Sequence, residues 1–260
     1  MSRMYRYLFN LSYIGTPFRG AQRQVKIGDD NTTIQGNIEI ALKNFQPINQ
    51  IVVTTSSRTD SGVHALHTTM HTDLERLNGE PYSTRGLTYQ LNKYFMNNSL
   101  PIRILSTYGV PNDFHCRYAV SRTYLYRLVV INSEFNTLAC HIPIEDLNRA
   151  YYFCSTRFDI EKFKSATKLF TGHHDFRTFM AKAPLKPDKI TRRVITRFEA
   201  IENSNKLYST FSIPDTWMRE VDSCTHIDVV IESSGFLYRQ VSFTSLSREL
   251  FEFECLKRRL

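Results

Sequence analysis

The 260-residue sequence has few cysteines, and their spacing does not match that of a metal site or a disulfide framework. There are five, an odd number, and no Cys-x-x-Cys pair occurs among them. This pattern supports neither a disulfide framework nor a zinc site, and it is typical of a protein from a reducing compartment.

Long apolar runs are also missing. A membrane-spanning helix needs about 20 predominantly apolar residues, whereas the longest runs here resemble residues 127–131. We therefore expect no membrane anchor, and no secretory signal is visible. The first 28 residues carry four arginines, one lysine and no acid, a composition shared with mitochondrial transit peptides. The same stretch also alternates like a core strand, so mitochondrial and cytoplasmic residence both stay open.

Positive charge is in excess along the whole chain. Lysine and arginine number 33 against 25 acidic residues, which gives a formal net charge of +8. Residues 1–110 hold 11 basic and 7 acidic groups, and residues 111–260 hold 22 and 18. Because each half has an excess of four, no single basic tail accounts for the charge. Distributed positive charge favours a polyanionic partner such as nucleic acid.

Periodicity in residues 1–108 predicts an α+β domain. Alternation at 5–13 places Tyr7, Phe9, Leu11 and Tyr13 on one face of a strand. Thr32 and Gln35 form the capping box expected before the first helix. The expected elements are a strand at 5–13, a helix through Ile34 and Phe45, a β-branched strand at 51–55, a polar loop at 56–62 and a helix near 84–95.

Residues 109–241 predict a second α+β domain, followed by an atypical tail at 242–260. Pro143 fits the first turn of a helix through Tyr151, and Asp159 can cap another helix. The expected strands lie at 123–131, 193–201, 206–213 and 226–232.

The loop at 56–65 is the segment whose side chains are best suited to catalysis or ligand binding. Its sequence is Ser-Ser-Arg-Thr-Asp-Ser-Gly-Val-His-Ala. A β-branched run ends there and delivers Arg58, Asp60 and Gly62 into a polar turn. Two interpretations are open. The pattern by itself favours an ordinary turn stabilised by an aspartate side chain. Alternatively, Arg58 and Asp60 form an ion pair or share an anionic ligand.

This loop resembles the active-site signature of the TruA-type pseudouridine synthases, within the animal tRNA pseudouridine synthase-like branch. Other segments similar to that family follow in the same order over about residues 5–241. They are 13–20 (Tyr-Ile-Gly-Thr-Pro-Phe-Arg-Gly), 22–24, 33–36, 113–119, 122–126, 172–176 and 235–241 (Gly-Phe-Leu-Tyr-Arg-Gln-Val).

The resemblance implies an α+β fold of two domains, each with a mainly antiparallel sheet and packed helices, and an active cleft between them. It implies isomerisation of uridine to pseudouridine in tRNA or another structured RNA, no metal or organic cofactor, and a homodimer. Asp60 takes the catalytic role, either by covalent attack or by abstraction of a sugar proton. Tyr124 is expected to pack on the target base, although a strand tyrosine is ordinarily a core residue.

The family resemblance also implies RNA contacts by arginines. Arg58 is expected to hold RNA whose target base has left its stack, which costs a few kcal/mol. Each such arginine has a plain alternative as a solvated surface charge. The further candidates are Arg19, Arg23, Arg117, Arg122 and Arg239.

Three departures from the family pattern bear on activity. Ala21 stands where the family commonly has tryptophan, and Ser242 stands where it has an arginine that pairs with the catalytic aspartate. Removing one member of a buried ion pair costs about 3–5 kcal/mol. Arg239, three residues earlier, is a candidate substitute.

Residues 242–260 do not resemble the family, which indicates an alternative transcript, a frameshift or a gene-model error. The alternative function is therefore a catalytically silent RNA-binding member or a truncated isoform.

Two histidine-containing segments could hold a metal. His64, His67 and His71 have helical spacing, but their flanking residues favour a strand. The segment 173–175, His-His-Asp, is expected to form a turn with local hydrogen bonds. We expect structural roles for both.

Overall fold

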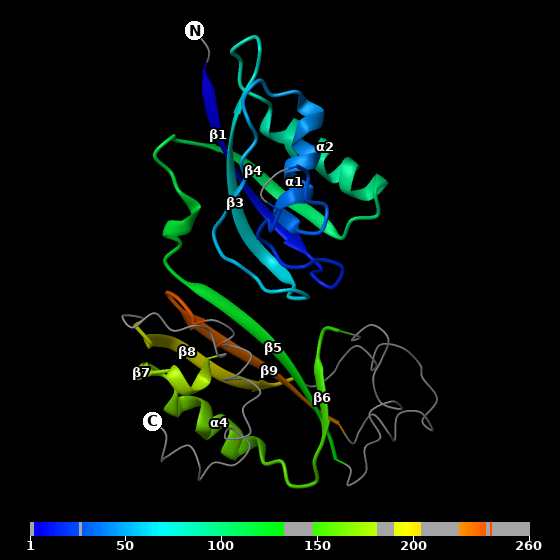
Figure 1. The fold of residues 1–260 in the computed structure, drawn as a ribbon. Helices are drawn as coiled ribbons and strands as arrows, with labels where there is room; N and C mark the ends of the chain where they lie inside the picture. The colour runs from blue at the N-terminus through cyan, green and yellow to red at the C-terminus, as the bar shows by residue number, and fades with distance from the viewer. Residues whose placement is uncertain are drawn as a thin grey trace. The chain divides into compact units, whose positions relative to one another are not determined.

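The computed structural model divides the chain into two compact units, Met1–Ala119 and Val120–Leu260 (Figure 1). Each unit is described by itself. The domain limits inferred from sequence, at residues 108 and 241, stay predictions. The described residues are 3–25, 28–132, 148–180, 190–203, 224–237 and 240.

The first unit contains a four-stranded antiparallel sheet with the strand order β2-β3-β1-β4. Its strands are β1 (Met4–Tyr13), β2 (Thr54–Thr55), β3 (Ala65–Glu75) and β4 (Ile102–Val110). Strand β1 lies in the middle of the sheet and pairs with both β3 and β4. Strand β2 is shorter than the strand expected at 51–55. Of those five residues, only Thr54 and Thr55 pair with β3.

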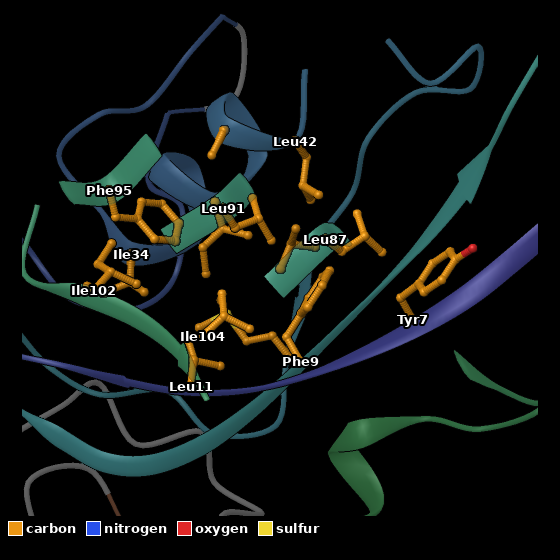
Figure 2. Packing of buried hydrophobic residues seen from close by; sticks show 14 of the residues in the cluster. Tyr7, Phe9, Leu11, Ile34, Leu42, Leu87, Leu91, Phe95, Ile102 and Ile104 are labelled. Atoms are coloured by element: carbon orange, nitrogen blue, oxygen red, sulfur yellow. The ribbon is translucent and has the colours of Figure 1, made fainter. Parts of the chain in front are cut away.

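Two helices, α1 (Ile34–Leu42) and α2 (Thr84–Asn97), pack against the sheet of the first unit (Figure 1). A single turn of 3-10 helix, η1 (Lys43–Phe45), extends α1. The expected alternation in β1 is confirmed, since its four predicted core residues are at most 5% exposed. Side chains of β1, β4 and both helices meet in one core (Figure 2).

The start of α1 differs by one residue from the expected capping box. Thr33, not Thr32, is the N-cap, and its hydroxyl accepts a hydrogen bond from the Gly36 N–H. Thr32 instead donates its hydroxyl to Asp30, at 2.6 Å. The Thr33 hydroxyl also donates to Asp30, at 3.2 Å, so the buried carboxylate holds both threonines at the start of the helix.

The opposite face of the same sheet holds the segment that leads toward the second unit. Residue alternation places His71 of β3 opposite Leu8, on the face away from Phe9. His71 Nδ1 lies 3.0 Å from the Cys116 thiol of η2 (Cys116–Tyr118). Burial, assisted by the Arg6 charge, lowers the pKa of His71 to about 4. This histidine is a neutral structural residue, which confirms the role expected for it.

The second unit contains a five-stranded sheet with the order β6-β5-β9-β8-β7. Neighbouring strands are antiparallel except for β5 and β6, which are parallel. The elements are β5 (Arg122–Ile131), β6 (Tyr151–Cys154), α4 (Ile160–Leu169), β7 (Gly172–Asp175), η4 (Arg177–Phe179), β8 (Arg192–Glu202) and β9 (Cys224–Ser233).

Most sequence expectations for the second unit are confirmed. Asp159 caps α4 by accepting from the N–H groups of Glu161 and Lys162. Two expectations are wrong. Tyr151 begins strand β6 instead of lying in a helix, and residues 173–175 belong to strand β7 instead of a turn. The expected helix start at Pro143, the strand at 206–213 and the helical pattern in 242–260 lie outside the described residues.

Together, the two units give the α+β class with predominantly antiparallel sheets that the sequence predicts. Among the described residues, no helix is long and apolar enough to cross a membrane.

Candidate active site

Asp60 lies at the start of a tight turn in the connection between β2 and β3. The N–H of Val63 donates to the Asp60 carbonyl at 3.2 Å, which closes the turn over residues 60–63. Gly62, in the third position, has a φ of 80°. A type II turn requires positive φ at that position, and glycine adopts it without strain. The turn leaves the Asp60 side chain exposed to solvent.

A second loop, residues 14–21, holds this turn through its backbone. The Ala21 N–H donates to the Thr59 carbonyl at 3.1 Å, and the Gly62 N–H donates to the Phe18 carbonyl at 3.4 Å. The Ser61 hydroxyl donates to the same Phe18 carbonyl at 3.2 Å. The backbone on both sides of Asp60 is therefore fixed by a neighbouring loop.

Two glycines allow these loops to approach so closely. A Cβ added at Gly15 would lie 1.9 Å from the Val63 carbonyl oxygen, and one at Gly20 would lie 2.9 Å from the Thr59 carbonyl oxygen. Gly20 also has a φ of 121°, which L side chains rarely adopt. The glycine-containing segment at 13–20, which resembles the family, is thus the structural support of the aspartate loop.

His64 ties the end of the aspartate loop to the start of the supporting loop. Its Nδ1 accepts a hydrogen bond from the Gly15 N–H at 3.0 Å. The imidazole nitrogen thus serves as an acceptor for backbone of the supporting loop. The expected structural role of His64 is confirmed. Within the described part of the chain, no three potential metal-ligating side chains gather.

Helix α1 anchors the supporting loop in turn. The N–H groups of Ile34 and Gln35 donate to the carbonyls of Gly20 and Ala21, at 3.2 and 2.9 Å. These are first-turn N–H groups that have no partner within a helix. The helix and the supporting loop therefore satisfy each other's backbone polar groups.

Asp30 orders the segment before α1, a role that the sequence reading did not find. Its carboxylate is 2% exposed. It accepts hydrogen bonds from the N–H groups of Gln24 and Thr32 and from the hydroxyls of Thr32 and Thr33. Burial by itself would raise the pKa of Asp30, but these hydrogen bonds outweigh it and lower the pKa to about 2.

Glu39 of α1 is a second buried carboxylate that connects the surrounding segments. It accepts hydrogen bonds from Arg23 Nη1 at 2.9 Å, Gln35 Nε2 at 3.0 Å and the Val53 N–H at 3.1 Å. The Arg23 guanidinium also donates to the carbonyls of Val25 and Gly28. This structural role of Arg23 competes with the phosphate contact expected of it.

Three of the other arginines expected to contact RNA lie at the surface of the first unit. Arg58 and Arg19 are exposed, and Arg117 is exposed on η2. Among the described residues of the first unit, no side chain pairs with the Asp60 carboxylate or the Arg58 guanidinium. The ion pair between those two residues, one of the alternatives that the sequence left open, therefore does not form among the described residues of this unit.

Tyr124 and Arg122 lie on β5 of the second unit. The half-buried Tyr124 ring packs edge-on against Phe236, with ring centroids 5.2 Å apart. Arg122 donates to the Ser234 carbonyl at 2.6 Å. The family-like segment at 235–241 thus begins beside the family-like tyrosine. Arg239 and Ser242 lie outside the described residues.

An exposed carboxylate on a hydrogen-bonded turn, two residues after an exposed arginine, defines a candidate centre for nucleophilic or acid–base chemistry on an anionic substrate. Comparison with known proteins specifies the class. No family model matches the chain. It is 34% identical to tRNA pseudouridine synthase-like 1 of Mus musculus over 238 residues, which covers 91% of this chain and 76% of that protein.

Two further relatives agree. The human tRNA pseudouridine synthase-like 1 is 32% identical over 91% of this chain and 73% of its own length. The tRNA pseudouridine synthase A of Dinoroseobacter shibae is 33% identical over 72% of this chain and 68% of its own length. The chain belongs to the tRNA pseudouridine synthase family.

Proposed function

We propose that this chain isomerises uridine to pseudouridine in tRNA or another structured RNA, with Asp60 as the catalytic carboxylate. The observation that carries the proposal is the exposed Asp60 side chain on a turn whose backbone is held on both sides. Catalytic groups gain most when their position is fixed before the substrate arrives.

The reaction fits a carboxylate. The bond between uracil N1 and ribose C1′ breaks, a bond between C5 and C1′ forms, the C5 proton leaves and N1 gains a proton. An ionised aspartate can promote cleavage by attacking the nucleotide or by removing a sugar proton. Tyr124 would pack on the extruded base and assist the proton transfer.

RNA recognition would rest on shape and backbone contacts. Arg58 would hold the RNA with its target base extruded, because guanidinium groups bind phosphates in two-pronged geometry and also stack on bases. Arg19, Arg23, Arg117, Arg122 and Arg239 would add phosphate contacts. We extend the proposal to a homodimer, on the family resemblance.

The test is conversion of tRNA transcripts by the purified full chain, with pseudouridine mapped chemically. We expect Asp60→Asn to lower the rate by about a thousandfold, within the range for loss of a nucleophile or acid–base group. Asp29→Asn is the matched control, because it removes the same charge from a carboxylate with 54% side-chain exposure. If wild-type protein binds tRNA without converting it, the enzyme proposal fails and the silent RNA-binding alternative replaces it.

A further inference from the structure

We propose that Tyr13 positions Asp60 by holding the hydroxyl of Thr59, an inference that rests on the proposed function. The Tyr13 hydroxyl lies 2.8 Å from Thr59 Oγ1, within hydrogen-bonding distance. Tyr13 is the last residue of β1, an inner strand of its sheet, and it is 5% exposed. A core strand thus reaches the residue next to the catalytic carboxylate.

Thr59 is held at two points at once. Its hydroxyl meets Tyr13, while its carbonyl accepts the Ala21 N–H at 3.1 Å. Ala21 is fully buried and is anchored to the first turn of α1 through Gln35. One contact comes from the sheet and the other from the helix-supported loop. Together they restrict rotation of the backbone just before Asp60.

The following turn restricts the backbone just after Asp60, through the Val63 N–H and Gly62. Loss of the Tyr13 contact would therefore free only one side of Asp60, and the loop would remain attached. Small displacements of a reacting group, on the order of 1 Å, cost about a hundredfold in rate. The buried Tyr13 side chain presents little surface to RNA, so substrate affinity should not change.

Three variants test this. We expect Tyr13→Phe and Thr59→Val each to lower kcat about 10- to 100-fold, with KM for tRNA within about twofold. Thr59→Ser keeps the hydroxyl and should retain most of the activity. The loss in the double variant should be smaller than the sum of the two single losses, because both variants remove the hydrogen bond between Tyr13 and Thr59.

Tyr82→Phe is the matched control. Tyr82 is also buried in the first unit, and its hydroxyl donates to the Phe45 carbonyl at 2.9 Å. It should lose comparable stability but keep its kcat. An unchanged kcat in Tyr13→Phe, an equal loss in Tyr82→Phe, or a Thr59→Ser variant as impaired as Thr59→Val would each overturn the proposal.

A measurement that needs no activity separates this inference from the proposed function. Amide hydrogen exchange of Ala21, whose N–H donates to the Thr59 carbonyl, should be at least about tenfold faster in the full-chain Tyr13→Phe variant than in wild type or Tyr82→Phe. If wild-type protein fails to convert tRNA but the exchange rises as expected, the loop restraint stands and the enzymatic proposal falls. Unchanged exchange overturns the restraint itself.

Discussion

The buried carboxylate that precedes helix α1 illustrates how a single residue stabilises the support of an active site. Asp30 accepts four close hydrogen bonds from two segments that precede α1. Its pKa is about 2 in the folded protein, against an ordinary value of 3.8. A lowered pKa means that the ionised carboxylate stabilises the fold above about pH 4, and that this contribution disappears as the pH falls from 3.8 through 2.

We therefore predict that Asp30→Asn lowers the free energy of unfolding by about 2 kcal/mol at pH 7, since one pKa unit corresponds to about 1.4 kcal/mol. The difference between variant and wild type should shrink as the pH approaches 2, and urea unfolding over this pH range measures it. Asp29→Asn serves as the control, because the exposed pair of Asp29 and Lys43 should contribute at most about 1 kcal/mol. A pH-independent difference for Asp30→Asn would contradict the assignment.

Sequence reading found Asp60 but missed the residues that support it. Asp60 sits in a contiguous, family-like segment of distinctive composition. Asp30 and Glu39 act on backbone groups of several separate segments, and only the folded chain brings these together. An aspartate three residues before the Thr33 cap was the available signal, since aspartates often bond backbone N–H groups nearby.

At the scale of elements, the periodicity of apolar residues predicted most strands and helices correctly. Strands β1, β5, β8 and β9 and helices α1, α2 and α4 appear where alternation or helical spacing placed them. The strand expected at 51–55 is short because some of its backbone groups form hydrogen bonds with side chains instead of with a neighbouring strand. The Val53 N–H donates to Glu39, and the Val52 carbonyl accepts from Thr72. A β-branched run cannot reveal that side chains have taken the place of a strand partner.

The close approach of the two loops gives an element-scale prediction. Gly15→Ala should destabilise the protein by about 2 kcal/mol or more, because the new methyl group would collide with backbone that lacks room to shift. It should also lower kcat by displacing the turn that carries Asp60. Chemical unfolding and tRNA conversion measure the two effects.

Gly109→Ala on β4 is the matched control for this substitution. A Cβ there would meet no atom within 4 Å, and the backbone has no positive φ. Its stability should be unchanged or rise by up to about 1 kcal/mol. Equal losses of stability in both variants would show that the close contact at Gly15 does not cause the destabilisation.

At the scale of the whole molecule, charge links both units to one kind of partner. Each half of the chain has an excess of four positive charges in sequence, within a total of +8. The arginines expected to contact RNA come from both units, with Arg58 in the first and Arg122 in the second. Binding that neutralises phosphates releases counterions, so affinity should fall steeply as salt rises.

The Arg58→Ala variant tests the salt dependence of RNA binding quantitatively. Arg58 is exposed, and a phosphate contact by it would release one counterion, so its removal should reduce the slope of log affinity against log salt by about one. Titration of tRNA at several salt concentrations measures the slope. Lys43→Ala removes the same charge from a side chain paired with Asp29 and should leave the slope unchanged. A slope that Arg58→Ala does not alter would exclude a phosphate contact by Arg58. If catalysis still fell, Arg58 would act on the base instead, because stacking releases no counterion.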